Sequence, residues 1–356
     1  MDGEKSFNPN IVENLNRVKI TFGNSVDLSI RQFDMKIRRK DLKLAIIFLS
    51  GLADKSKLDN LSLELNELIV SEICNQDTLD LCFDKLKTSL LCESKIHEGS
   101  DYETLYNQIL SGNTIILADG CNKFLVLNTF GPEGRSITEP TSQTIIRGPK
   151  EAFTEKISIN ISLIRRRIKD KSLKIDNMAI GSITKTNVAV MYLDKIAKPD
   201  IINEVKSRLS QIEVDGILDS GYIEELIKDD PHSVFPTFLN SEKPDSVAAG
   251  LLEGKIAIVV DGTPYVLTAP ALFVDFLQVS EDYYHHYIIS SMTRIFRCIS
   301  LFLTLLVPSI YIALSTFHQE MIPTTLLVSI AAQREGVPFP AFVEAMILKK
   351  LKKLIN

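Results

Sequence analysis

An uncharged apolar run, Cys298 to Phe317, constrains the fold of this chain more than any other stretch of its sequence. About 20 apolar residues in a helix suffice to cross the hydrocarbon core of a bilayer, so the run predicts a membrane span at about 297–317. Arg294 and Arg297 precede the run, and no Lys or Arg follows it until Arg334. Because basic residues collect on the cytosolic side, we expect the region before the span to be cytosolic. The alternative is a helix buried in the core of a soluble protein.

The composition is that of a foldable protein with one membrane-like portion. The 356 residues leave room for two or three domains, and 45% of them are apolar and 24% charged. The net charge of −5 argues against general nucleic-acid binding, which needs a basic surface. The five cysteines and five histidines follow no metal-ligand spacing, so we expect reduced, buried thiols and no cofactor. The polar N-terminus lacks the apolar core of a secretory signal.

Two segments of the N-terminal region resemble each other. Each holds a glycine, an apolar strand and an Asp-Gly pair that is typical of a hairpin turn. These residues recur at an offset of 142: Gly112, Asp119 and Gly120, then Gly254, Asp261 and Gly262. The earlier strand Ala45–Leu49 is echoed by Ala189–Leu193. We therefore predict an α/β fold with two related subdomains, the alternative being a chance likeness between two common hairpins.

The predicted organisation has five parts: a polar N-terminal segment (1–40), a first cytosolic α/β subdomain (41–132), a linker with a helix (133–172), a second cytosolic α/β subdomain (173–285) and a membrane region (286–356). Asp27–Lys40 predicts a helix, because Ile30, Phe33 and Ile37 recur at helical spacing. Further helices are expected at 58–73, 77–91, 201–212 and 220–230. Three prolines predict a loop over 231–244.

The linker combines a proline-led helix with a basic run. Gly148 precedes Pro149, which predicts the first turn of a helix whose apolar stripe runs from Phe153 to Ile168. We expect this helix to pack on both subdomains. The run Arg165–Arg167 near its end suits the negative end of the helix dipole. The run is either a solvated basic face or a patch of salt bridges between subunits.

The residues after the span form an interrupted apolar segment at about 322–348. Ile322–Gln333 is too short to cross a bilayer, and the stretch Arg334-Glu335-Gly336-Val337-Pro338-Phe339-Pro340 follows it. Charge and proline at membrane depth are tolerated inside protein or beside water, which favours a broken or re-entrant helix lining an ion pathway. An amphipathic segment in the interface is the alternative. Within the span, Pro308 predicts a kink packed against a neighbouring helix or a simply tolerated proline.

Catalytic motifs do not occur in the sequence: there is no nucleophile elbow, P-loop, zinc-protease motif or dinucleotide-binding motif. His285 and His286 are adjacent, so they point to different faces of a helix and are expected at a juxtamembrane surface. We therefore expect a protein that is not an enzyme.

Several motifs occur in order along about residues 40–348. Those of the cytosolic region include Glu139, Pro140, Arg147, Gly148, Pro149, Phe153, Glu155, Asn160, Asp245, Asp261 and Gly262. Those of the membrane region include Gln319, Glu320, Pro323, Gln333, Arg334, Glu335, Gly336, Pro338 and Pro340. Together they resemble the motifs of the A subunits of GerA-type spore germinant receptors.

The resemblance implies a nutrient-sensing subunit in the inner membrane of a dormant spore. It implies a homo-oligomeric ring that assembles with a permease-like B subunit and a lipoprotein C subunit. The B subunit is expected to bind the nutrient and the ring of A subunits to conduct ions in response. An enzymatic activity or a cofactor is not implied.

The chain departs from the family in two places. Family members usually carry Arg where this chain has Lys243, and they continue with further spanning helices where this chain turns to a lysine-rich stretch, 349–353. We therefore expect a C-terminally truncated form: a relic, a regulator that joins rings of intact subunits, or an incomplete record. A hypothesis of another class is a membrane-tethered module whose two lobes close on a small molecule.

Overall fold

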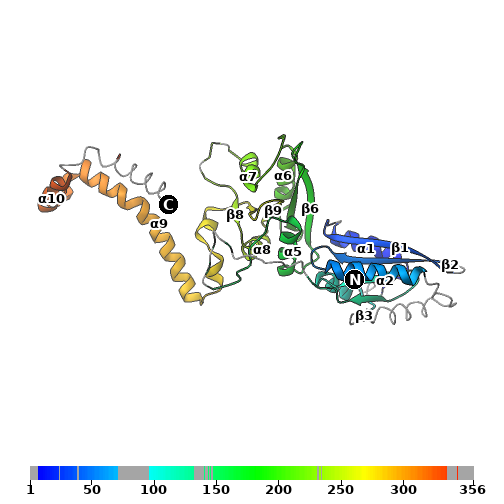
Figure 1. Cartoon of the computed structure of the whole chain (residues 1–356). Coiled ribbons are helices and arrows are strands. Elements are labelled where there is room, and N and C mark those ends of the chain that lie inside the picture. The colour runs from blue at the N-terminus through cyan, green and yellow to red at the C-terminus, as the bar shows by residue number, and fades with distance from the viewer. Residues whose placement is uncertain are drawn as a thin grey trace. The chain divides into compact units, whose positions relative to one another are not determined.

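The computed structural model contains two α/β copies followed by a long apolar helix (Figure 1). It describes residues 7–23, 25–37, 40–70, 96–131, 140, 143, 145, 147–230, 232–233, 235–334 and 343. The chain divides into two units, Met1–Phe276 and Leu277–Asn356. Both copies belong to the first unit, and the long helix belongs to the second.

The first copy is an antiparallel sheet with helices on both faces. Its strands are β1 (Leu28–Ile37), β2 (Lys40–Leu49), β3 (Ile96–Gly99), β4 (Thr114–Ala118) and β5 (Phe124–Leu127), in the order β1-β2-β4-β5-β3. The helices α1 (Ile11–Phe22) and α4 (Tyr102–Leu110) pack on one face. The helix α2 (Lys55–Val70) packs on the other face.

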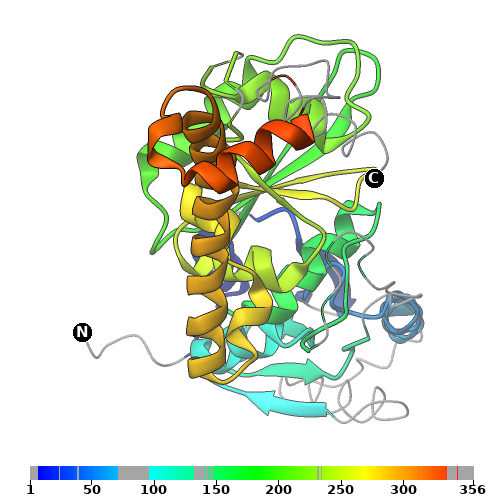
Figure 2. The same ribbon diagram turned by 90° about the vertical axis from the view of Figure 1, so that its left-hand side faces the viewer.

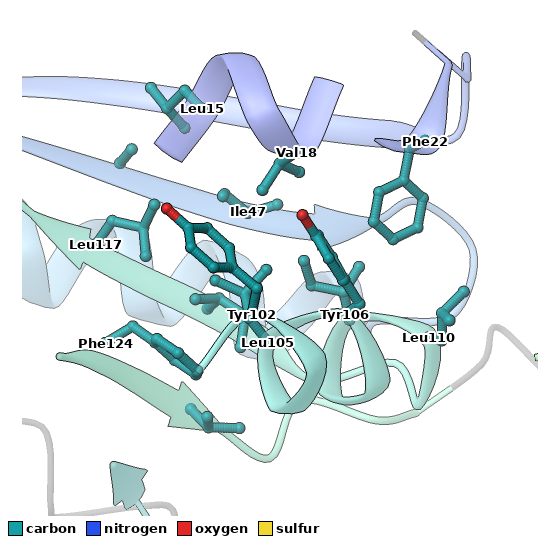
Figure 3. Close-up of a cluster of buried hydrophobic side chains, with 14 of the residues drawn as sticks. Leu15, Val18, Phe22, Ile47, Tyr102, Leu105, Tyr106, Leu110, Leu117 and Phe124 are labelled. Atoms are coloured by element: carbon teal, nitrogen blue, oxygen red, sulfur yellow. The ribbon is translucent and has the colours of Figure 1, made fainter. Parts of the chain in front are cut away.

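The core of the first copy follows from the alternation of side chains along each strand. Ile47 and Leu117 belong to the cluster that α1 and α4 cover, whereas Ile46 and Ile116 belong to the cluster under α2. Figure 3 shows the first of these clusters, in which the aromatic rings of α4 point toward α1. The Tyr102 hydroxyl there donates to a side-chain oxygen on α1, so the polar end of a buried ring has a partner.

The second copy repeats the arrangement of the first. Its strands are β6 (Leu173–Ile180), β7 (Thr186–Leu193), β8 (Leu239–Ser241), β9 (Ile256–Val260) and β10 (Val266–Ala269), in the order β6-β7-β9-β10-β8. The helices α5 (Ile157–Arg167) and α8 (Pro244–Leu252) cover one face, and α6 (Pro199–Ser210) and α7 (Ser220–Ile227) cover the other. Equivalent strands occupy equivalent places, so the predicted pair of related α/β subdomains is confirmed.

Two secondary-structure predictions are wrong. The expected helix at Asp27–Lys40 is the edge strand β1, which pairs with β2 from Leu28↔Leu49 to Ile37↔Lys40. The pairing with the next strand along the chain overrides a spacing of apolar residues that also fits a helix. The expected loop at 231–244 contains β8, a strand of three residues that pairs with β10. The helix expected at 77–91 lies outside the described residues.

The predicted linker helix begins later than expected. Pro149 lies outside any helix, and α5 starts at Ile157 with Lys156 as its N-cap. The apolar side of α5 packs into the core of the second copy, and its residue Arg165 reaches the first copy, so the expectation that it packs on both is confirmed.

The second unit is helical in its described part. It contains the 3-10 helices η2 (Ser280–Tyr283) and η3 (Gln319–Met321) and the α-helices α9 (Tyr287–Thr316) and α10 (Thr324–Arg334). Figure 2 shows α9 as one continuous helix, in orange. At 30 residues it is about 45 Å long at 1.5 Å per residue, and it is the one helix in the described ranges that is long and apolar enough to cross a membrane. Pro308 lies inside it.

Candidate functional site

Several predicted site residues meet at the start of α5. The Asp261 carboxylate accepts a hydrogen bond from the backbone N–H of Ile157, the first residue of the helix, at 3.0 Å. The next residue, Gly262, has φ 91°, a conformation that favours glycine, and its N–H donates to the Glu155 carbonyl at 2.8 Å. The Asp-Gly turn after β9 therefore binds the backbone on both sides of the helix start.

A buried amide closes the same site. The Asn160 side chain is fully buried, accepts from the Thr154 N–H at 2.8 Å and donates to the Thr154 carbonyl at 2.6 Å. Phe153, the residue before Thr154, is buried as well, and its N–H donates to the Glu242 carbonyl at 2.8 Å. These bonds fix the backbone just before α5, which begins at Ile157 and not at Pro149.

The first copy contains the same arrangement at the start of α1. The Asp119 carboxylate accepts from the Ile11 N–H at 3.1 Å, and the Gly120 N–H donates to the Pro9 carbonyl at 2.8 Å. The buried Asn14 side chain donates to a backbone carbonyl six residues earlier, as Asn160 does. The two copies share these bonds, which is consistent with a role in holding the start of each helix against its sheet.

The other predicted residues of the first unit lie apart from this cluster. Arg147 and Gly148 are exposed and Pro149 is half-buried. Asp245 stands in the first turn of α8, where its carboxylate lies 3.2 Å from the Nζ atom of the buried Lys243. Glu139 lies outside the described residues.

A buried ion pair joins the two copies. The Arg165 Nε atom donates to the Asp27 carboxylate at 2.8 Å, and the two side chains are 1% and 4% exposed. The guanidinium also donates to the Ser25 hydroxyl at 3.2 Å and to the Asp170 carbonyl at 3.3 Å. The expectation of a solvated basic face is thus wrong for Arg165. The available signal was its position beside Ile161 and Ile168 on the apolar stripe.

The rest of the basic run has a local partner. Arg166 and Arg167 are half-buried and pair with Glu151 at 3.4 and 2.8 Å. Contacts of this kind at a surface are weak, so they shape the end of α5 without deciding its stability. A role between subunits remains a prediction for these two residues.

Within the second unit, a buried carboxylate ties η2 to α9. The Asp282 carboxylate accepts two hydrogen bonds from Arg297, both 2.6 Å long, and one from Arg294 at 3.3 Å. The Asp282 carbonyl accepts a further bond from the Ser290 hydroxyl at 2.6 Å. The bonds from Arg297, followed by the N–H of Val279 and the second arginine, hold the pKa of the Asp282 carboxyl below its ordinary value against the opposing effect of burial. The sequence analysis missed this contact.

The two adjacent histidines sit at the same junction. His286 is the N-cap of α9, and its side chain accepts from the Ile288 N–H at 3.5 Å. His285 lies 3.4 Å from the Glu281 carboxylate. Within the described part of the chain, no group of three His, Cys, Asp or Glu residues could hold a metal ion.

The predicted membrane residues that the structure describes are exposed. Pro308 lies in α9, and Gln319, in η3, donates to the Ser315 carbonyl at 3.0 Å. Glu320, Pro323 and Gln333 are also exposed. Arg334 ends α10, and Glu335, Gly336, Pro338 and Pro340 lie outside the described residues.

A cavity of about 660 Å³ lies in the second copy. It is lined by residues from the end of β6 and from the segment between α6 and α7, within 178–182 and 209–215. Its lining includes no residue of the first copy, so it is not the cleft between two lobes that one hypothesis expected.

Comparison with known proteins assigns the family. The model of the family described as "Bacillus/Clostridium GerA spore germination protein" matches residues 16–355, which is nearly the whole chain. The chain belongs to the GerA family. It is 44% identical over 342 residues to spore germination protein KA of Bacillus subtilis, and 35% identical over 348 residues to GerLA of Bacillus cereus.

The GerA-family chain also resembles a solved structure. The N-terminal domain of the A subunit of the Bacillus megaterium spore germinant receptor GerK3 is 34% identical, with a TM-score of 0.58. The alignment covers 76% of this chain and 98% of that domain. The sequence alignment with spore germination protein KA covers 96% of this chain and 62% of that protein, so the chain spans less than two thirds of that protein's length.

Proposed function

We propose that this GerA-family chain is an A-type subunit of a spore germinant receptor. The observation that carries the proposal is the likeness of its two α/β copies to the N-terminal domain of the GerK3 A subunit, at 34% identity over nearly all of that domain. In this chain the copies are followed by the candidate span α9, as a membrane receptor subunit requires.

The proposed location is the inner membrane of the spore, with the α/β copies on the cytosolic side. Arg294 and Arg297 lie near the start of α9, and the described residues after the helix contain no further Lys or Arg before Arg334. This bias follows the positive-inside rule. The apolar side chains of α9 are exposed along its length, which suits lipid or a neighbouring spanning helix.

The proposed mechanism is assembly and gating. The chain forms a ring with further copies and joins a permease-like B subunit and a lipoprotein C subunit. Nutrient binding to the B subunit shifts the ring to a state that releases ions and starts germination. The hydrogen bonds of Asp261 and Gly262 at the start of α5 stabilise the second copy for this assembly. The stretch from Gln319 to Pro340 contributes to the ion path.

Affinity purification from spores tests the proposal. An epitope-tagged chain, expressed from its own locus, is recovered from detergent-solubilised spore inner membranes, and the co-purified proteins are identified by mass spectrometry. We expect B and C subunits in the eluate, and a loss of nutrient-triggered potassium release when the gene is deleted. A matched strain carries the same tag on an unrelated inner-membrane protein. Recovery of the chain without either subunit, together with unchanged potassium release in the deletion strain, would refute the proposal.

The cavity in the second copy favours a second candidate function, a membrane-tethered module that binds a small molecule. Its volume of about 660 Å³ lies in the range of ligand pockets. A thermal-shift screen of the purified full chain against nutrients checks this function. A shift with one nutrient that is lost on Ser210→Leu, a substitution at the cavity wall, supports binding, and no shift across the panel contradicts it.

A further inference from the structure

The 3-10 helix η1 (Phe273–Leu277) contains the last residues of the first unit and the first residue of the second. Its apolar side chains are exposed, whereas its charged side chain is largely buried. Four of its large apolar residues, counting the one just before it, are between 42% and 63% exposed: Leu272, Phe273, Val274 and Phe276. We call these four residues the η1 patch. Three large side chains in a row and a fourth nearby form an apolar surface that water does not favour.

The single charged side chain of η1 points the other way. The Asp275 carboxylate accepts from the Leu272 N–H at 2.7 Å and lies 2.8 Å from the Lys255 Nζ atom. Both charged side chains are largely buried. The entry to the helix is fixed as well, because the Ala271 N–H donates to the Thr237 carbonyl at 3.0 Å.

These bonds fix the orientation of the η1 patch. A frayed segment would leave Asp275 in water and turn its apolar residues toward the protein. Here the ion pair with Lys255 is formed next to the sheet of the second copy, and the apolar residues are presented outward. The arrangement therefore fits an apolar or interfacial surrounding on the outer side.

Chain continuity identifies that surrounding. The candidate span α9 begins at Tyr287, eleven residues after Phe276. An extended chain advances at most about 3.6 Å per residue, so Phe276, the last residue of the patch, lies within about 40 Å of the start of the span. The intervening stretch exposes Val279 and Tyr283, and Tyr287 is exposed at the start of α9. Aromatic residues beside a span are typical of the membrane–water interface.

We propose that the η1 patch inserts into the membrane–water interface and seats the α/β copies on the lipid surface. The inference rests on the proposed function in one respect, that α9 crosses the membrane. The occupant of the patch is the headgroup and upper acyl region of the lipid. A second copy of the chain is the competing occupant, and the experiment below separates the two.

The sequence contains no tryptophan, so a single Trp introduced anywhere is the sole indole reporter. The full chain carrying Phe273→Trp is reconstituted into phosphatidylcholine vesicles whose acyl chains are brominated at a shallow or a deep position. Bromine quenches indole emission only at short range and thus reports depth. We expect Phe273→Trp to emit at shorter wavelength than Trp at an exposed position of the first unit in the same vesicles, and to lose emission chiefly with the shallow bromine. Val274→Trp gives an independent second position.

Two matched variants are the controls. Ile183→Trp lies in the turn between β6 and β7, where the native side chain is 76% exposed, and should show no quenching. Phe302→Trp lies in α9, where the native side chain is 62% exposed, and should lose emission chiefly with the deep bromine.

The outcomes separate the two proposals. Quenching at Phe302→Trp without quenching at Phe273→Trp and Val274→Trp overturns the inference and leaves the membrane placement intact. An absence of quenching at all three positions overturns the membrane placement and the inference together. A short-wavelength emission at Phe273→Trp that lipid bromine does not quench, and that shifts on dilution of protein in the vesicles, assigns the patch to a second copy and also overturns the inference.

Discussion

At the scale of single residues, we expect substitutions of Arg165 and Asp282 to destabilise the fold strongly. Each is a buried charge whose partners come from a different element. A buried ion pair adds little over an apolar pair of the same shape, but the loss of one partner leaves a charge without compensation. Substitutions at these positions should therefore behave differently one at a time and in pairs.

The first prediction concerns the pair between the copies. Arg165→Met should lower the free energy of unfolding of the first unit by about 3–5 kcal/mol, because Asp27 is left buried and unpaired. The double variant Arg165→Met/Asp27→Leu should recover most of that loss. Urea unfolding of purified residues 1–276 measures both values.

The neighbouring arginine is the control for this experiment. Arg166 is half-buried and pairs with Glu151 at 3.4 Å, so Arg166→Met should cost below about 1 kcal/mol. Equal losses of unfolding free energy for Arg165→Met and Arg166→Met would contradict a stabilising ion pair between Arg165 and Asp27.

The second prediction is a pH dependence at the junction before α9. The bonds from Arg297 lower the pKa of Asp282 in the folded chain below the ordinary 3.8, so the folded state binds a proton less readily than the unfolded state. The stabilisation is present above that ordinary value and is lost as the pH falls through the lower folded value. At neutral pH, Asp282→Asn should destabilise the full chain in detergent, by about 1.5–3 kcal/mol for hydrogen bonds to charged groups.

Thermal melts of the two proteins from pH 7 down to pH 3 test this prediction. The gap between the wild type and Asp282→Asn should be constant above about pH 5 and narrow as the carboxylate takes up its proton below about pH 4. A gap that is unchanged at pH 3 would show that the carboxylate charge contributes nothing.

At the scale of elements, the two copies solve the same problem with the same residues. An Asp-Gly turn in each copy binds the start of a helix that is far away in sequence. The sequence predicted the turns, because Asp-Gly between apolar strands is a local signal. It could not predict the helix starts that the turns bind, because those contacts join residues more than 100 positions apart.

Other elements also divide into those that their own sequence pattern predicts and those whose structure depends on a partner. The C-terminal half of β2 and the strands β4 and β9 are mostly apolar runs and were predicted, since their pattern is local. β1 was mistaken for a helix because Ile30 and Phe33 follow a helical spacing. In the strand they pack on opposite faces of the sheet, and the pairing with β2 decides the structure of the segment. The predicted site residues Glu155, Asn160 and Asp261 proved to be neighbours, yet the motif alone did not say that their contacts hold the fold.

The third prediction concerns the paired caps. Asp119→Ala and Asp261→Ala should each lower the free energy of unfolding of residues 1–276 by about 0.5–2 kcal/mol, the usual cost of losing a cap. The two sites share no partners, so the losses should add in the double variant. Asp200→Ala, at an exposed position in the first turn of α6, is the control and should cost less. A double variant no less stable than either single variant contradicts two independent, equivalent caps.

At the scale of the whole molecule, the chain contains a duplicated α/β region followed, within the described residues, by one helix long and apolar enough to cross a membrane. The family and the fold of the copies agree with the A subunit domain of a germinant receptor. The apolar side chains of the two sheets are buried in the cores of the copies, whereas the apolar side chains of α9 are exposed. We therefore expect its role to depend on the membrane and on partner subunits.

The span is the feature on which the account depends most. Flotation of the tagged full chain on a density gradient, after alkaline extraction of spore membranes, tests it directly. The double substitution Leu306→Arg/Ile310→Arg places two charges in the middle of α9, each costing about 2.5–3.5 kcal/mol of insertion free energy. Ile289→Arg/Met292→Arg, near the start of the helix and before Arg294, is the matched control. We predict that the wild type and the control float with lipid and the double variant in the middle of α9 does not; a wild-type chain that stays in the soluble fraction would contradict the account.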